Sequence, residues 1–188
     1  AAYQQAIQLD PKNARYHYEL GNVYSKQERY EEAIAAYQQA NQLSPEWGLP
    51  HERLGRIYRK QERYEEAIAA YQKAAQLSPE WGLPHYQLAE VYSKQERYEE
   101  AIAAYQKAIQ LDPKDARYHY ELGEVYSKQE RYEEAIAAYQ QAIQLDPYPY
   151  AYKYKDLGDL CLQQKLYEEA IAAYQQAIQL DPKNARYH

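Results

Sequence analysis

A ten-residue stretch that returns at fixed spacing constrains the fold of this chain more than any other feature. Residues 29–38 read Arg-Tyr-Glu-Glu-Ala-Ile-Ala-Ala-Tyr-Gln, and the same residues start again at Arg63, Arg97 and Arg131. A fifth copy lacks only the arginine and runs from Tyr167. A period of about 34 residues is typical of solenoids, because a unit of this size cannot bury its apolar face and must pack against the next one. The sequence therefore predicts one array of stacked units.

Each unit contains the pattern of two helices. In the first unit, His17, Leu20, Gly21 and Tyr24 follow an i, i+3, i+4, i+7 spacing, which predicts a helix over about 14–27. A second stripe of small and apolar side chains between 31 and 43 predicts a partner helix after a short loop. Prolines repeat at the unit boundaries, at positions 11, 45, 79, 113 and 147. We expect a partial unit at 1–13, full units at 14–47, 48–81, 82–115, 116–149 and 150–184, and the start of a further unit at 185–188.

Composition narrows the classes of partner. The net charge of −6 and the pI near 5.5 argue against nucleic acid, because phosphate binding needs a basic stripe. No apolar run reaches the roughly 18 residues of a membrane span. Cys161 is the single cysteine, so it forms no intramolecular disulfide and fits a reducing compartment. We therefore expect a cytoplasmic protein that binds neither nucleic acid nor membranes.

The order of residues within each unit resembles the tetratricopeptide repeat. In the first unit the matching positions are Leu20-Gly21, Tyr24, Tyr30, Ala33, Tyr37, Ala40 and Pro45. The same frame fits the units that contain Leu54, Leu88 and Leu122. The resemblance implies an all-α fold, a right-handed superhelical α-solenoid of antiparallel helix pairs. It also implies a non-catalytic protein–protein interaction scaffold that binds a peptide or partner segment in a concave groove.

By the same resemblance, the first helix of each unit lines the groove. The expected peptide-binding residues are Arg15, Tyr18, Asn22, Glu52, Arg53, Arg56, Arg59, Tyr86, Glu90, Tyr120 and Glu124. The tyrosines among them are rigid amphipathic anchors of the type enriched at binding hot spots. Arg53, Arg56, Arg59 and Lys60 make the second unit cationic, which suits an acidic side chain or a terminal carboxylate. The alternative is that these side chains are simply solvated.

Catalytic and metal-binding patterns are missing from the sequence. There is no Ser/His/Asp arrangement and no Gly-rich phosphate loop, and the repeated Glu-Glu pairs are expected to point outward. The histidines fall in one column, at positions 17, 51, 85, 119 and 188. Stacked units lie roughly 10 Å apart, too far for two of these rings to share a metal ion. We expect a packing role for the column, and neither catalysis nor a metal or other cofactor.

Three departures from the repeat pattern leave alternatives open. Trp47 and Trp81 either cover the seam between units or form exposed contacts for a partner. Glutamates at positions 28, 62, 96 and 130 occupy a turn where the family often has glycine. That turn is therefore built differently, or the array tolerates a strained left-handed residue. The segment 148–155 has Tyr at every second position, followed by Lys at the last two, and is either a divergent helix start or a surface that stacks single-stranded bases.

The two ends of the chain have the same sequence. Residues 172–188 are identical to residues 1–17. This identity suggests a window of a longer array, or a piece that stacks head to tail on its own copy. Two alternative functions follow, namely a structural module that self-associates end to end into a continuous superhelix, and the recognition domain of a larger multidomain protein.

Overall fold

The structure, a computed structural model, describes the backbone of residues 2–146, 151–181 and 183. Eleven helices and no strand occur in these residues, which confirms the all-α class. The chain divides into two compact units, Ala1–Val91 and Tyr92–His188, and each is described by itself.

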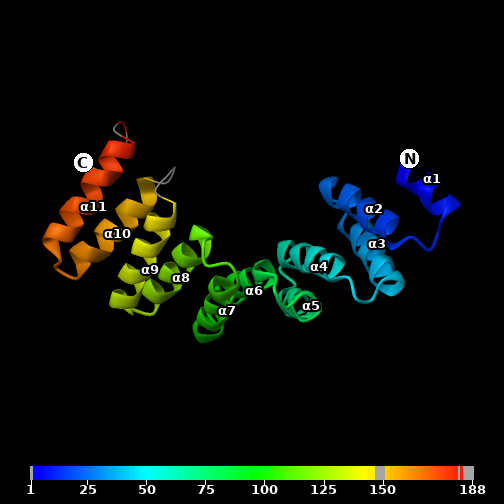
Figure 1. The fold of residues 1–188 in the computed structure, drawn as a ribbon, viewed down its shortest axis with the longest axis horizontal. Coiled ribbons are helices and arrows are strands. Elements are labelled where there is room, and N and C mark those ends of the chain that lie inside the picture. Colours follow the sequence, from blue (N-terminus) through cyan, green and yellow to red (C-terminus); the bar gives the residue numbers. More distant parts are fainter. Residues whose placement is uncertain (1, 147–150, 182, 184–188) are drawn as a thin grey trace. The chain divides into compact units, whose positions relative to one another are not determined.

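The first unit is built from consecutive helix pairs (Figure 1). Its helices are α1 (Ala2–Leu9), α2 (Ala14–Lys26), α3 (Tyr30–Leu43), α4 (Gly48–Lys60) and α5 (Tyr64–Leu77), and α6 (Gly82–Lys94) begins in it. The second unit contains α7 (Tyr98–Leu111), α8 (Ala116–Lys128), α9 (Tyr132–Leu145), α10 (Ala151–Gln163) and α11 (Tyr167–Leu180). Within each unit the two helices of a repeat pack on each other, α2 on α3, α4 on α5, α8 on α9 and α10 on α11.

Local signals fix where the helices begin. Asn13 caps α2, because its side chain accepts a hydrogen bond from the backbone N–H of Arg15 at 3.1 Å, and Asp115 caps α8 in the same way. Pro50 and Pro84 lie in the first turns of α4 and α6, where a missing N–H costs nothing. Glutamate pairs open α3, α5, α7, α9 and α11, where the helix dipole favours negative charge.

Close contact between the paired helices depends on glycine and alanine. A Cβ atom at Gly21 would lie 2.7 Å from Cε1 of Tyr37, and one at Gly55 would lie 2.5 Å from Cε1 of Tyr71. Alanines at positions 33, 40, 67, 74, 101, 108, 135 and 142 have no exposed surface. The small residues let the backbones approach, and a tyrosine of the second helix fills the volume that remains.

The turn inside each repeat contains a left-handed residue. The φ angle is 59° at Glu28, Glu62, Glu96 and Glu130, and 62° at Lys165. The N–H of Glu28 bonds to the carbonyl of Ser25 at 3.1 Å, and that of Arg29 to the carbonyl of Tyr24 at 3.0 Å. This pair of bonds is the Schellman arrangement that ends many helices, usually with glycine at the left-handed position. Of the two alternatives left by the sequence, the strained turn is the one observed.

The histidine column and Trp47 take part in packing. His17 Nε2 lies 3.1 Å from the carbonyl oxygen of Pro11, and His119 Nε2 lies 3.4 Å from that of Pro113. Trp47 is half-buried, with its ring centroid 4.8 Å from that of Tyr18, so it covers the seam. His188 lies outside the described residues.

The last repeat departs from the others at its start. Residues 147–150 of the Tyr/Lys segment lie outside the described residues, and α10 begins at Ala151. Lys153 is buried in α10, and Tyr154 packs against the core around Ala177. In its described part, the Tyr/Lys segment is therefore a divergent helix start.

Candidate functional site

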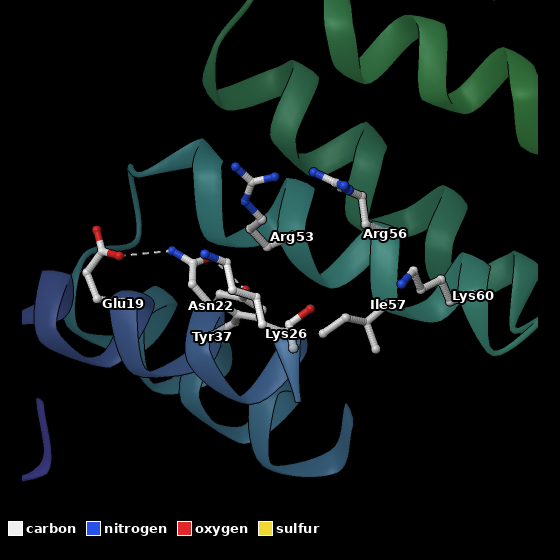
Figure 2. A pocket seen from close by; sticks show the side chains of 9 residues that line it. Glu19, Asn22, Lys26, Tyr37, Arg53, Arg56, Ile57 and Lys60 are labelled. Atoms are coloured by element: carbon white, nitrogen blue, oxygen red, sulfur yellow. Dashed lines mark hydrogen bonds between the residues drawn. The ribbon is translucent and has the colours of Figure 1, made fainter. Parts of the chain in front are cut away.

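A cationic pocket lies between α2 and α4 in the first unit. Its volume is about 370 Å³, and its lining residues are Glu19, Asn22, Ser25, Lys26, Tyr37, Arg53, Arg56, Ile57 and Lys60. We call these nine residues the cationic pocket. Figure 2 shows that Glu19, Asn22 and Lys26 come from α2, and that Arg53, Arg56 and Lys60 come from α4. Three of the expected binding residues, Asn22, Arg53 and Arg56, are brought together here.

Hydrogen bonds hold the α2 side of the cationic pocket in place. The Tyr37 hydroxyl donates to Asn22 Oδ1 at 2.8 Å, and Asn22 Nδ2 donates to Glu19 Oε2 at 3.1 Å. Burial raises the pKa of Tyr37 well above its usual range, so this hydroxyl stays a donor. The polar side chains on the α2 side are therefore linked by hydrogen bonds. Most of the charge that a ligand would meet in the pocket comes from the cationic side chains.

Arg53 and Arg56 also lie beside the buried carboxylate of Glu52. Glu52 was expected on the exposed groove, but its side chain is fully buried in α4. Gln87 Nε2 donates to Glu52 Oε1 at 2.7 Å, Arg53 Nη1 lies 3.2 Å from Oε2, and Arg56 Nε lies 4.0 Å from Oε1. An isolated buried carboxylate is costly, so the arginines compensate it. The expectation that Glu52 is accessible is wrong.

Tyr18 is likewise hidden. Only 7% of its surface is exposed, because Trp47 and Tyr37 cover its ring and Arg53 Nε donates to its hydroxyl at 3.2 Å. Burial opposes the charge of Arg53, but the Tyr18 hydroxyl and the Glu52 carboxylate raise the pKa of Arg53 above its ordinary value. Tyr18 therefore orients Arg53 and is not an exposed anchor.

Two other expected binding residues pair with each other. Arg59 Nη1 donates to Glu90 Oε2 at 2.5 Å, and both side chains are about three-quarters buried. Near this pair, the hydroxyl of Tyr71 is buried without a hydrogen-bond partner among the described residues. In the repeat register, Arg56 stands where Asn22 accepts the bond from Tyr37. Arg56 has no acceptor atom, so the Tyr71 hydroxyl cannot repeat the bond that Tyr37 donates to Asn22.

An acidic pocket occupies the equivalent place in the second unit, between α8 and α10. Its volume is about 200 Å³, and its lining residues, which define the name, are Glu124, Ser127, Tyr139, Asp156, Asp159, Leu160 and Gln163. In the repeat register, Glu124 corresponds to Asn22, Asp156 to Arg53 and Asp159 to Arg56. The same position in the fold thus carries opposite charge in the two units.

Tyrosine hydroxyls order the carboxylates of the acidic pocket. Tyr120 donates to Asp156 Oδ2 at 2.6 Å, Tyr174 donates to Asp159 Oδ1 at 2.7 Å, and Tyr139 donates to Glu124. Burial, followed by the charges of Glu124 and Asp159, raises the pKa of Asp156 above its ordinary value, although the Tyr120 bond opposes the shift. Tyr120 and Glu124, both expected on the groove, are therefore in one bonded network.

The remaining expected residues lie apart from the cationic pocket. Arg15 is exposed near the start of α2, and Tyr86 is half-buried in α6. The sequence missed Glu19, Lys26, Asp156 and Asp159. A three- or four-residue step from Asn22 along α2 would have found the first two. The aspartates were hidden because the last repeat is one residue longer, which shifts its register.

Both pockets offer charged side chains and hydrogen-bonding groups to a ligand. In the described part of the chain, no three His, Cys, Asp or Glu side chains are placed to hold a metal ion. No described helix combines the length and the apolarity that crossing a bilayer requires.

Comparisons with solved structures and with protein-family models both find the same repeat. Among proteins with curated functions, no sequence matches this chain. The structure resembles crystal structures of YrrB, "a TPR protein with an unusual peptide-binding site" (TM-score 0.79, 24% identity, 100% of this chain and 96% of that one) and MamA (0.80, 26%, 89% and 98%). It also resembles MamA 41-end from Desulfovibrio magneticus RS-1 (0.79, 22%, 92% and 97%).

Family models give the stronger result, because they cover most of the sequence. A model described as TPR repeat matches residues 1–28, 55–96, 90–130 and 158–188. Two models described as tetratricopeptide repeat match residues 116–149 and 17–45. The chain belongs to the tetratricopeptide repeat family.

Proposed function

We propose that this chain is a non-catalytic scaffold that binds an acidic segment of a partner protein or peptide in the cationic pocket. The observation that carries the proposal is the meeting of Lys26, Arg53, Arg56 and Lys60 at one pocket with a single lining carboxylate, Glu19. Arginine side chains favour carboxylate ligands, because the guanidinium donors match two oxygens at once. YrrB, whose fold is similar, is described as having a peptide-binding site, which supports the same class of function.

The charge of the pocket is specific to one repeat. At the place of Arg53 the other repeats carry Glu19, Gln87, Glu121 and Asp156. At the place of Arg56 they carry Asn22, Glu90, Glu124 and Asp159. The helices form with either charge, so the fold itself does not require arginine at these positions. A partner that reads this surface would therefore bind the second repeat in preference to the others.

A display library of random peptides tests the proposal. We expect the purified chain to select peptides enriched in Asp and Glu, and we expect Arg56→Asn to reduce their affinity about tenfold, as for the loss of a charge-assisted hydrogen bond. Asparagine is the residue of the first repeat at this position. The matched control is Lys73→Asn, which removes the same charge from the exposed face of α5. Equal affinity of the Arg56→Asn variant and the parent chain would contradict the proposal.

A second candidate function is end-to-end self-association. Ile171 is 50% exposed in α11, whereas Ile34, Ile68 and Ile102 are 5–7% exposed at the same place in earlier repeats and Ile136 is half-buried. Tyr167 and Leu166, beside it in α11 and the preceding turn, are exposed as well. A second copy of the chain would bury this surface. Sedimentation over a hundredfold concentration range tests it, with Ile171→Lys expected to abolish any association, and a monomer throughout would rule it out.

A further inference from the structure

We propose that the cationic pocket is a seat for a phosphorylated side chain of the partner, a phosphomonoester dianion. This inference rests on the proposed function and names the chemistry that the pocket selects. Four cationic side chains and one carboxylate line the pocket. Behind them, Glu52 takes up part of the charge of Arg53 and Arg56. Counting both carboxylates against the four cations leaves two positive charges, which a single carboxylate ligand would only half neutralise.

Hydrogen-bonding capacity supports a dianion. The Tyr37 hydroxyl and the Asn22 amide are already bonded on the α2 side of the pocket, so they offer little to a ligand. The remaining donors are the Ser25 hydroxyl and the cationic groups of Arg53, Arg56, Lys26 and Lys60. The four cationic side chains come from two helices (Figure 2). A carboxylate has two acceptor oxygens, whereas a phosphomonoester has three and about twice the charge near pH 7. A phosphate therefore offers more acceptor oxygens and more charge than a carboxylate to donors that come from both helices.

The rest of the chain argues against a nucleic-acid source of the phosphate. Most positions equivalent to Arg53 and Arg56 in the other repeats are acidic, among them Glu90, Glu124, Asp156 and Asp159. A phosphodiester backbone needs a run of cations, whereas this chain carries a net charge of −6. An isolated phosphate on a protein segment satisfies the pocket without bringing further negative charge to the acidic positions.

Glu52, Arg53 and Arg56 permit a variant that removes the seat and keeps the repeat intact. The triple substitution Glu52→Tyr, Arg53→Glu, Arg56→Asn gives the second repeat the three residues that the first repeat carries at Tyr18, Glu19 and Asn22. Because it removes the buried carboxylate together with the arginines that compensate it, no unpaired buried charge remains. Lys73→Glu is the control, since it makes the same change of two in net charge on the exposed face of α5.

The probes are small, because the partner is unidentified. Titrations followed by NMR, including the arginine Nε signals, use N-acetyl-phosphoserine amide, N-acetyl-glutamate amide and inorganic phosphate. We expect phosphoserine amide to shift the Arg53 and Arg56 signals and to bind about tenfold tighter than glutamate amide. The triple variant should lose this preference, and Lys73→Glu should keep it. Inorganic phosphate that binds as tightly as phosphoserine amide would identify a free-phosphate site instead and overturn the proposal.

A pH series separates the charge states. The second phosphate pKa is about 6, so lowering the pH from 7 to 5 should weaken phosphoserine amide about tenfold. Glutamate amide, with a pKa near 4.3, should change little. The titratable groups facing the pocket are Glu19 and Lys26 on α2, Tyr37 on α3 and Lys60 on α4, with Glu52 behind. Protonation of Glu19 or Glu52 would strengthen anion binding, so it would oppose the weakening expected from the phosphate.

Three further results would overturn the inference. These are equal affinity for the phosphoserine and glutamate probes, an unchanged preference in the triple variant, and tighter binding of a 5′-phosphorylated oligonucleotide than of a phosphoserine peptide. If the phosphate preference fails while acidic peptides from the display library still depend on Arg56, the phosphate inference is wrong and the scaffold proposal stands. If neither phosphorylated nor acidic peptides bind, both are wrong.

Discussion

Replacing Glu62 by glycine should stabilise the turn between α4 and α5 by about 0.5–1 kcal/mol. The φ angle of Glu62 is 59°, and a residue with a Cβ atom pays about 1–2 kcal/mol in this left-handed region. Glycine avoids that strain, but it lowers the free energy of unfolding by about 0.5–1 kcal/mol, because it gives the unfolded chain more conformational freedom. The difference between the two terms leaves a net gain, and the same argument applies to Glu28, Glu96, Glu130 and Lys165.

Native-state hydrogen exchange is the assay that reads this turn directly. The backbone N–H of Arg63 donates to the carbonyl of Tyr58 at 2.9 Å, so its exchange reports the opening of the turn. A gain of 0.5–1 kcal/mol at 25 °C should slow that exchange about two- to fivefold. A global melting curve is less suitable, because repeat arrays do not unfold in one cooperative step.

Two control variants decide whether conformation is the cause. Glu62→Ala removes the charge and keeps the Cβ atom, so the exchange rate of Arg63 should stay close to that of the parent chain. Gln38→Gly places glycine in the exposed middle of α3, where it should destabilise by about 0.5–1 kcal/mol. The reasoning is refuted if Glu62→Ala stabilises the turn as much as Glu62→Gly, since charge would then explain the effect.

Three further predictions concern the core and the acidic pocket. Tyr71→Phe should be neutral or stabilising by up to about 1 kcal/mol in native-state hydrogen exchange, because it removes an unpaired buried hydroxyl. Tyr37→Phe should cost about 1 kcal/mol, because it breaks the bond to Asn22. Equal effects would count against this account. Gly123→Ala should cost about 1–3 kcal/mol by the same assay, since the new Cβ atom would lie 2.7 Å from the Tyr139 ring, and a neutral result would mean that the seam adjusts. Because the pKa of Asp156 is raised in the folded protein, its contribution to the free energy of unfolding is lost as the pH rises through that pKa. Asp156→Asn should therefore stabilise the second unit at pH 7, with a gain that disappears below about pH 4, and a gain independent of pH would contradict the assignment.

The helices and the core seam follow from the sequence, because they depend on what all repeats share. The spacing of Gly21, Ala33, Tyr37 and Ala40 places these side chains on facing helix surfaces in any repeat of this length. The structure buries all four of them. The left-handed turn was one of two alternatives, and the sequence could not choose between them, since a glutamate there has no intrinsic preference for that conformation.

The candidate binding surface was less predictable, because it depends on residues that differ between repeats. The position of Tyr18 was expected to face the groove, yet Trp47 covers it from a loop that breaks the repeat pattern. Its counterpart in the second repeat, Glu52, is buried and accepts a hydrogen bond from Gln87. The 34-residue period does not predict this contact, because the equivalent residues of the other repeats differ. Side chains at the border of a core are exposed or hidden by single neighbours, and helical spacing does not identify those neighbours.

Charge at the two pockets can therefore change without disturbing the fold. Between the cationic and the acidic pocket, the tyrosine that closes the seam is kept, at Tyr37 and Tyr139, and its hydroxyl donates to α2 or α8 in each case. What changes is the pair of residues on the facing helix, Arg53 and Arg56 in one and Asp156 and Asp159 in the other. Because each repeat contacts mainly its neighbours, such a change is felt locally. We therefore propose that the residues that decide what this chain binds are those that depart from the repeat, as Arg53 and Arg56 do.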